Sequence, residues 1–530
     1  MQIHTFRNRL SDIGLLLIFY GVISIIVSQN GSAVESVPVD NIYAKYCASC
    51  HGPDRLGATG PALLPENLGR VNKEQAGNAI YAGLPSTQMP AFRQELGSDQ
   101  INALVDFIYT PLTDLPDWDS EKINNSHIIY HFDAHSGNTP VFDADPLNLF
   151  FVVEAGDHHA TILDGDRLEP VFRFKTRYAL HGGPKYSPDG RYIYLASRDG
   201  WVSMFDLYNL RLVAETRAGI NTRNIAVSND GRYVIAGNYL PHTLVILDAG
   251  DLSLVKVIPV EGDSGNSSRV SAVYDAPPRN SFIVALKDIP EIWEIIYADN
   301  AEPVYTGMVH DYRYQEGIPV DSPFPVRRIR LDDYLDDFFF DDKYQNLVGA
   351  ARNSRNGQVV NLIVGKKIAD IDLSGLPHLG SGVTWQYQGR PVIATPNLKE
   401  GIVSIIDEIT WRTIKKIKTL GPGFFMRTHE NTPYAWVDVF FGPDKDAVHV
   451  IDKSTLEIVK TLRPAPGKTS GHVEFSRDGR YALLSIWEND GAIVVYDADT
   501  LTEVKRIPMN KPSGKYNVYN KINGSSGTSH

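Results

Sequence analysis

The chain has 530 residues, a formal net charge of -12 and only two cysteines. The excess of acidic groups argues against nucleic acid and against an anionic membrane surface as partners, and it favours solubility. Two cysteines cannot supply the disulfide framework on which many exported proteins rely, so the burial of a large apolar core must hold this chain together.

The N-terminal residues 1–33 have the pattern of an export signal. Arg7 and Arg9 precede an apolar run over 13–27, and small residues follow at 31–33. A charged region, an apolar region and a small-residue cleavage site are in the order typical of a signal peptide. The run is shorter than the roughly 20 apolar residues of a membrane span, although an uncleaved anchor stays open as an alternative. We therefore expect a protein of the periplasm.

The motif Cys47-Ala-Ser-Cys50-His51 contains both cysteines of the chain. C-x-x-C-H is the attachment sequence of a c-type haem, in which the thiols bond to the porphyrin and the imidazole reaches the iron. A zinc site would need further soft ligands, and a redox dithiol would not need the histidine. Haem c usually takes a methionine as its second ligand, and Met89 precedes the stiffening Pro90. We predict one covalent haem c with His51 and Met89 on its iron; a core-filling role is the alternative for Met89.

Residues 39–112 fit a small all-α cytochrome c domain. A helix over 41–47 leads into the haem motif. Ser98-Asp99 is expected to cap a last helix over 100–109, in which apolar residues recur at helical spacing. The turn-rich segment that follows indicates a linker over 113–122.

Residues 123–524 have the pattern of a repeated all-β fold. The sequence Asp-Gly-Arg-Tyr occurs at 189–192, 230–233 and 478–481, each time as a turn before an apolar strand. Together with weaker copies, these make eight units at a spacing of roughly 40 to 65 residues, the period of propeller blades. We predict an eight-bladed β-propeller; seven blades with an irregular insert is the alternative, because 300–342 is long and unlike the rest. The weaker copies begin near Leu149, Ser281, Tyr344, Pro391 and Tyr434.

Several of these segments resemble the haem d1-binding blades of the cytochrome cd1 family. They are Tyr178-Ala-Leu-His181, Ala196-Ser-Arg198-Asp199-Gly200, Asn221-Thr-Arg223-Asn224, Ala236-Gly-Asn-Tyr239-Leu-Pro241 and Gly514-Lys-Tyr516-Asn-Val-Tyr519-Asn520. A cytochrome c domain followed by an eight-bladed propeller is the plan of that family, so the resemblance covers nearly the whole mature chain. It implies that His181 is the proximal ligand of the tetrapyrrole iron. It also implies that arginines bind carboxylates of the macrocycle, and that the contacts to it include Arg198, Arg223, Tyr239, Arg352 and Tyr516.

One departure from the family bears on the function. The nitrite reductases of this family have two distal histidines, which bind and protonate nitrite. The matching segments, 284–293 and 330–338, contain no histidine. In this respect the chain resembles the dihydro-haem d1 dehydrogenase of haem d1 biosynthesis, which oxidises a propionate of the precursor to an acrylate. The resemblance implies an oxidoreductase whose substrate is dihydro-haem d1, whose product is haem d1 and whose own haem c receives the electrons.

Forming that double bond removes two electrons and two protons, so a base must stand near the reacting side chain. The candidate base is His378, in Leu376-Pro-His378-Leu-Gly380-Ser-Gly382. The glycines would let the loop approach a flat ligand closely, and an imidazole pKa near 6.5 suits proton transfer at neutral pH. His378 could instead ligate the iron from the distal side; Asp332, Asp333 or a route without a protein base would then be the alternatives.

Two other functions stay open at this point. One is a nitrite reductase that uses unusual proton donors, such as Lys287 or Asp336. The other is a non-enzymatic carrier of haem d1. The expected partners are dihydro-haem d1, a periplasmic electron acceptor and a nitrite reductase that receives the finished haem d1.

Overall fold

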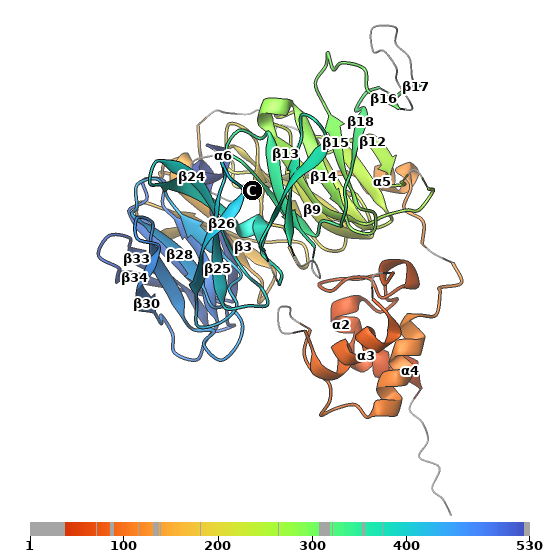
Figure 1. Cartoon of the computed structure of the whole chain (residues 1–530), viewed down its shortest axis with the longest axis horizontal. Helices are drawn as coiled ribbons and strands as arrows, with labels where there is room; N and C mark the ends of the chain where they lie inside the picture. The colour runs from red at the N-terminus through yellow and green to blue at the C-terminus, as the bar shows by residue number, and fades with distance from the viewer. Residues whose placement is uncertain are drawn as a thin grey trace, which may run out of the picture. The chain divides into compact units, whose positions relative to one another are not determined.

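The computed structural model describes residues 38–523, apart from positions 70, 85–88, 115, 131–136, 138, 181, 263, 307–317, 321, 352–355 and 374. The predicted export signal, His181 and Arg352 therefore lie outside the described residues. A helical segment comes first, and a long β-rich segment follows it (Figure 1). Within the described ranges, no helix combines the length and the apolar character that crossing a membrane requires.

The helical segment contains the helices expected of a small cytochrome c domain. They are α1 (Val39–Tyr46), α2 (Ala48–His51), α3 (Lys73–Ala82) and α4 (Ser98–Ile108), with a 3-10 turn at Pro65–Asn67. Their apolar faces meet in one cluster that contains Cys47, Ile80 and Leu104. The apolar spacing predicted for the last helix is confirmed, because Ile101, Leu104, Val105 and Ile108 are all buried.

The start of α4 differs from the prediction. The helix begins at Ser98, so Ser98 and Asp99 lie in its first turn and do not cap it. The N-cap residue is Gly97, whose backbone N–H donates to Oε1 of Gln100 at 3.0 Å. A glutamine at the third helical position can satisfy the N-cap amide, so the cap moves one residue upstream of the serine.

The predicted linker is only partly irregular. Residues from Ser120 to Asn125 form helix α5, which Asp119 caps by accepting a hydrogen bond from the backbone N–H of Lys122 at 2.9 Å. Ile123 of this helix is fully buried in an apolar cluster of the β-rich segment. The end of the segment 113–122 therefore belongs to the packed β-rich part.

The β-rich segment is an eight-bladed propeller, as predicted. Each blade is a four-stranded antiparallel sheet, and the innermost strands of neighbouring blades lie against one another. Blades 1 to 4, from the innermost strand outward, are β35 (Pro512–Asn517), β2 (Leu149–Glu154), β3 (His159–Asp164) and β4 (Glu169–Lys175); β5 (Lys185–Tyr186), β6 (Tyr192–Ala196), β7 (Trp201–Asp206) and β8 (Arg211–Arg217), with β1 (Ile128–Ile129) added outside; β9 (Asn221–Val227), β10 (Tyr233–Leu240), β11 (Thr243–Asp248) and β12 (Leu254–Pro259); and β13 (Val270–Ala276), β14 (Ser281–Leu286), β15 (Glu291–Ile296) and β18 (Val326–Arg330). Blades 5 to 8 are β19 (Asp337–Phe340), β20 (Asn346–Ala350), β21 (Gly357–Asn361) and β22 (Lys366–Ile371); β23 (Val383–Tyr387), β24 (Arg390–Pro396), β25 (Ile402–Asp407) and β26 (Arg412–Lys418); β27 (Met426–Thr428), β28 (Tyr434–Asp438), β29 (Val448–Asp452) and β30 (Glu457–Leu462); and β31 (Ser470–Phe475), β32 (Tyr481–Ile486), β33 (Gly491–Asp497) and β34 (Thr502–Met509).

The unusual segment 300–342 is an insertion within blade 4 and does not replace a blade. It leaves the sheet after β15, includes the small sheet of β16 (Tyr305–Thr306) and β17 (Ile318–Pro319), and returns as β18. The alternative of seven blades is therefore wrong.

The repeated Asp-Gly-Arg-Tyr sequence forms the turn before the second strand of blades 2, 3 and 8. In the first copy, Asp189 accepts a hydrogen bond from the N–H of Arg191 at 3.1 Å, and Ser187 Oγ accepts one from the N–H of Tyr192 at 2.9 Å. Gly190 between them has a φ of 75°, a conformation that favours glycine. The other two copies make the same bonds, so the repeat is a local turn chemistry that any blade can use.

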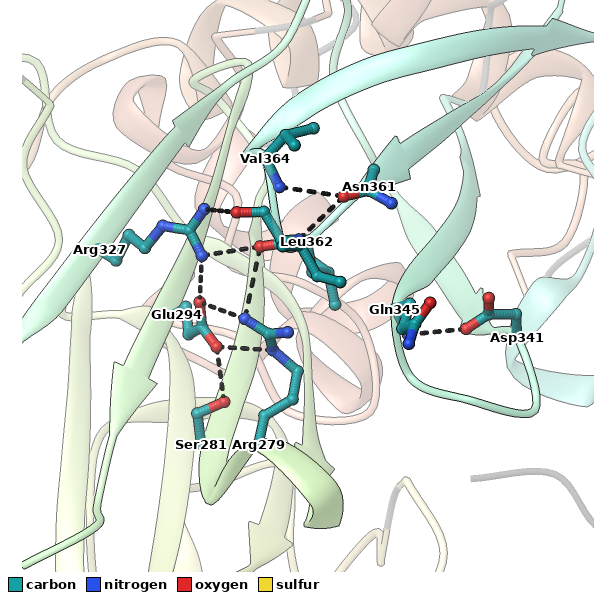
Figure 2. A network of polar contacts seen from close by, with 10 residues as sticks. Arg279, Ser281, Glu294, Arg327, Asp341, Gln345, Asn361, Leu362 and Val364 are labelled. Carbon is teal, nitrogen blue, oxygen red and sulfur yellow. Dashed lines mark hydrogen bonds and ion pairs between the residues drawn. The ribbon is translucent and has the colours of Figure 1, made fainter. Parts of the chain in front are cut away.

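A buried carboxylate ties blade 4 to blade 5 (Figure 2). Glu294 accepts hydrogen bonds from Arg279 at 2.8 Å and from Arg327 at 3.0 Å. Arg327 also donates to the carbonyl of Leu362, in the hairpin between β21 and β22, at 2.7 Å. The Glu294 side chain is only 4% exposed, so both guanidinium groups compensate a charge that is almost out of water.

Candidate functional site

The haem motif lies on the short helix α2. Cys47 is its N-cap residue, Cys50 is exposed, and His51 ends the helix. The carbonyl of Pro61 is 2.8 Å from His51 Nδ1; because a carbonyl can only accept, Nδ1 carries the proton and Nε2 keeps a lone pair for a metal. Burial lowers the pKa of His51, which also favours the neutral ligand form. Two thiols followed by this imidazole fit a covalently attached haem.

Met89 lies beside the same part of the molecule. Its side chain packs against the apolar cluster that contains Cys47. The backbone carbonyl of Met89 accepts a hydrogen bond from the N–H of Leu84 at 3.1 Å, which holds the loop. This position suits the second haem ligand, and that role stays a prediction.

In the propeller, the orientation of His378 is set by one hydrogen bond and one ring contact. The residue precedes β23 of blade 6, and its Nδ1 donates to the carbonyl of Phe424. The imidazole stacks on the Phe424 ring, with centroids 4.4 Å apart and an angle of 18° between the planes. Because Nδ1 carries the proton, Nε2 is the nitrogen that can accept a proton or bind a metal. Burial lowers the pKa of His378, while the nearby charge of Asp337 opposes that effect.

Asp337 holds the loop that carries His378. Its Oδ2 accepts a hydrogen bond from the N–H of Gly380 at 2.6 Å, and its Oδ1 accepts one from the hydroxyl of Tyr274 at 3.1 Å. A Cβ on Gly380 would lie 2.8 Å from Oδ2. The structure thus adds to the sequence argument about this glycine: it allows the loop to approach the carboxylate. The alternative base Asp332 instead has a 73% exposed side chain and pairs with Lys367 at 2.7 Å.

A cluster of cations surrounds the buried Tyr239 in blades 2 to 4, and we call it the Tyr239 cradle. The charged groups of Arg198, Arg269 and Lys287 lie 5.8, 5.7 and 5.8 Å from the tyrosine ring centre. Burial alone would raise the pKa of Tyr239, but these cations and Arg223 lower it to about 7. The structure thereby brings together three residues that the sequence singled out, and it adds two more.

The cradle is partly neutralised by two carboxylates. Arg269 pairs with Asp288 at 2.6 Å, and Lys287 pairs with Asp336 at 2.7 Å. Sequence reasoning considered Lys287 and Asp336 only as separate proton donors, and it missed Arg269. No local pattern identifies Arg269, because it reaches the cradle from the loop before β13, and only the ring of blades brings it there.

Tyr516 lies elsewhere on the ring, on β35 of blade 1. Its ring contacts the imidazole of His472 at 4.9 Å and lies 5.5 Å from Nζ of Lys521. Burial raises the pKa of its hydroxyl to about 12, so Tyr516 is a neutral donor at any physiological pH. The predicted contacts of Arg352 and the predicted iron bond of His181 fall outside the described residues.

Comparison with known proteins places the chain in a family. Residues 144–521 match the family described as Cytochrome D1 heme domain, and residues 38–108 match the one described as Cytochrome C oxidase, cbb3-type, subunit III. The chain belongs to the cytochrome D1 heme domain family.

Among its relatives is the dihydro-heme d1 dehydrogenase of Pseudomonas aeruginosa, 54% identical over 98% of this chain and 99% of the relative. A solved structure of dihydro-heme d1 dehydrogenase NirN in complex with DHE is 55% identical, has a TM-score of 0.76, and matches 92% of this chain and all of that one. The nitrite reductase of Stutzerimonas stutzeri is 25% identical, over 93% of this chain and 94% of the relative.

Proposed function

We propose that this protein is a dihydro-haem d1 dehydrogenase, an oxidoreductase that converts a propionate side chain of its tetrapyrrole substrate to an acrylate. The observation that carries this proposal is the 54% identity to the Pseudomonas aeruginosa dehydrogenase over essentially the whole of both chains. The arrangement of basic and cationic groups in the propeller supports it independently.

The reaction must balance two C–H bonds against one C=C bond. The saturated side chain loses two protons and two electrons, and the new double bond becomes conjugated with the macrocycle. His378 Nε2 is the group that would take one proton, because Nδ1 is committed to the Phe424 carbonyl. The second proton leaves to solvent. A haem c bound at Cys47, Cys50 and His51 would supply a one-electron acceptor, which must be used twice in each turnover.

The Tyr239 cradle supports a substrate rich in carboxylates. Arg198 and Arg223 repel each other, and burial together with this repulsion lowers the pKa of Arg198 to about 9. A cation in that position is stabilised when an anion binds. Substrate carboxylates at the cradle would hold the macrocycle while His378, on the other side of Asp337, acts on one side chain.

The decisive experiment is turnover of the purified haem c-containing protein with dihydro-haem d1 and a one-electron oxidant. Mass spectrometry should show the loss of two hydrogen atoms from the tetrapyrrole, and reduced haem c should appear in the absorption spectrum. Tetrapyrrole that binds and is recovered unchanged would favour the carrier function. Rapid nitric oxide formation from nitrite by protein loaded with finished haem d1 would favour the nitrite reductase, against which the missing histidines argue.

We further propose that the protein works in the periplasm, passes electrons to a soluble acceptor there and hands haem d1 to a nitrite reductase. The signal-like residues 1–33 and the covalent haem motif support this location. Fractionation of cells with the full-length chain should recover the protein in the periplasmic fraction. Recovery in the cytoplasm without haem c would contradict the proposal.

A further inference from the structure

A second cluster of cations lies outside the Tyr239 cradle, where blades 7, 8, 1 and 2 come together. It consists of Lys185 on β5, Arg427 on β27, Lys515 on β35 and Lys521 on α6 (Val518–Ile522), and we call it the lysine cluster. These groups act on one another electrostatically: Arg427 lowers the pKa of all three lysines, and Lys185 also lowers that of Lys521. They come from positions up to several hundred residues apart, so the closed ring assembles them.

Two members of the lysine cluster have clear structural partners. Arg427 lies 3.6 Å from the carboxylate of Glu474, and Lys515 donates to the carbonyl of His472 and to Ser485 Oγ, the latter at 3.0 Å. These bonds fasten the innermost strands of blades 7, 8 and 1 to one another. Arg427 and Lys515 therefore serve the fold.

Lys185 and Lys521 have a different environment, in which their ammonium groups face aromatic rings. Nζ of Lys185 is 5.6 Å from the ring centre of Tyr274, and Nζ of Lys521 is 5.5 Å from that of Tyr516. Across the described part of the chain, Lys185 forms no ion pair with a carboxylate. Burial first, and then Arg427, lower the pKa of Lys185 to about 8. A positive charge held here gains stability when an anion arrives.

We propose that Lys185 and Lys521 form a subsite for one carboxylate of the tetrapyrrole substrate, an inference that rests on the proposed function. Tyr274 connects this subsite to the base: its ring faces Lys185, and its hydroxyl donates to Asp337, which holds the His378 loop. The cradle occupies blades 2 to 4, His378 precedes blade 6, and the lysine cluster spans blades 7, 8, 1 and 2. Two anion sites in different sectors of the ring would fix which side chain of the macrocycle meets His378.

The test is a spectroscopic titration of the haem c-containing protein with dihydro-haem d1. Lys185→Gln and Lys521→Gln should each weaken binding about tenfold or more, the size expected for one charge-assisted hydrogen bond. Lys185→Arg keeps the charge and should bind nearly as well as the wild type, which guards against a variant that fails because it misfolds. Lys418→Gln is the matched control, because it removes the same charge from an exposed position on the outermost strand of blade 6.

A second arm separates a substrate carboxylate from a free anion. Thermal unfolding is measured in sodium acetate and in sodium chloride at equal ionic strength, for the wild type and for both glutamine variants. If acetate protects only the wild type while tetrapyrrole affinity is unchanged in the variants, the subsite takes a free carboxylate and the substrate assignment is overturned. Unchanged affinity without acetate protection, or equal weakening by Lys418→Gln, overturns the subsite itself.

The proposed function can fail separately from this inference. Wild-type protein that binds dihydro-haem d1 but never oxidises it would refute the dehydrogenase, while the affinities of the lysine variants would still decide the subsite. Wild-type protein that does not bind dihydro-haem d1 would overturn both.

Discussion

At His378, a single hydrogen bond decides which ring nitrogen can take part in chemistry. Donation from Nδ1 to the Phe424 carbonyl leaves the Nε2 lone pair exposed to whatever lies above the ring. Stacking on Phe424 limits rotation of the imidazole, so the lone pair points in a fixed direction. Burial keeps the ring neutral at neutral pH, and a neutral ring is what a base requires.

His378→Gln should lower the rate of acrylate formation about 10²- to 10⁴-fold, because a positioned base is lost. In the wild type, burial lowers the pKa of His378, so the rate should fall only as the pH drops below the ordinary imidazole range near 6.5. Single-turnover kinetics between pH 5 and pH 8 with mass-spectrometric detection measure both effects. An acidic limb above pH 7, or a wild-type rate in the variant, would show that another group takes the proton.

Asp337→Asn should impair turnover without abolishing tetrapyrrole binding. The variant keeps one acceptor oxygen for Gly380 or Tyr274, but it removes the negative charge that raises the pKa of His378. The acidic limb of the pH–rate profile should therefore move to lower pH, and a merely structural defect would not cause that shift. Asp332→Asn, at an exposed site paired with Lys367, is the matched control and should leave the profile unchanged.

At the scale of elements, a buried ion cluster joins the insertion-bearing blade 4 to blade 5 (Figure 2). Glu294→Ala would leave Arg279 and Arg327 facing each other without their carboxylate, so the propeller should lose about 3 kcal/mol of stability. Glu457→Ala is the control, because its exposed pair with Lys415 should contribute less than about 1 kcal/mol. Thermal unfolding followed by far-UV circular dichroism compares the two. Equal shifts would mean that the burial of Glu294 does not matter.

Local chemistry explains what the sequence could predict about the elements. The Asp-Gly-Arg-Tyr turns depend on bonds within five residues, so reading them as blade turns succeeded without any tertiary information. The start of α4 was missed because Gln100 competes with Ser98 for the capping role, and both choices fit the local pattern. The haem motif is equally local, since α2 positions all three of its residues.

The candidate site could be predicted only where the family resemblance reached. Arg198, Arg223 and Tyr239 were found in this way, and the structure groups them in one cradle. Arg269 and the lysine cluster were missed because their members come together only when the ring closes. Such contacts have no periodicity or short spacing, so nothing in a single sequence marks them.

At the scale of the whole molecule, blade 1 combines strands from opposite ends of the propeller sequence. β35 supplies its innermost strand, with Phe151 opposite Tyr516 and Val153 opposite Gly514. Removing residues 512–530 should therefore expose an edge of β2 and a row of buried apolar side chains. We expect insoluble protein or a broad, non-cooperative thermal transition. Removing 524–530 alone takes away no part of β35 or α6, and the shortened chain should melt like the full one.

Closure by the last strand also sets an order of events during synthesis. Until β35 is made, β2 has an open edge and the propeller is an unfinished arc, although most of its blades already exist. Long-range pairing of this kind is slow and leaves strands exposed to wrong partners. Because Tyr516 and Lys515 sit on this same strand, the chain cannot assemble the lysine cluster before its own ring is shut. An incomplete molecule is thus prevented from capturing a scarce and reactive tetrapyrrole that it could not yet process.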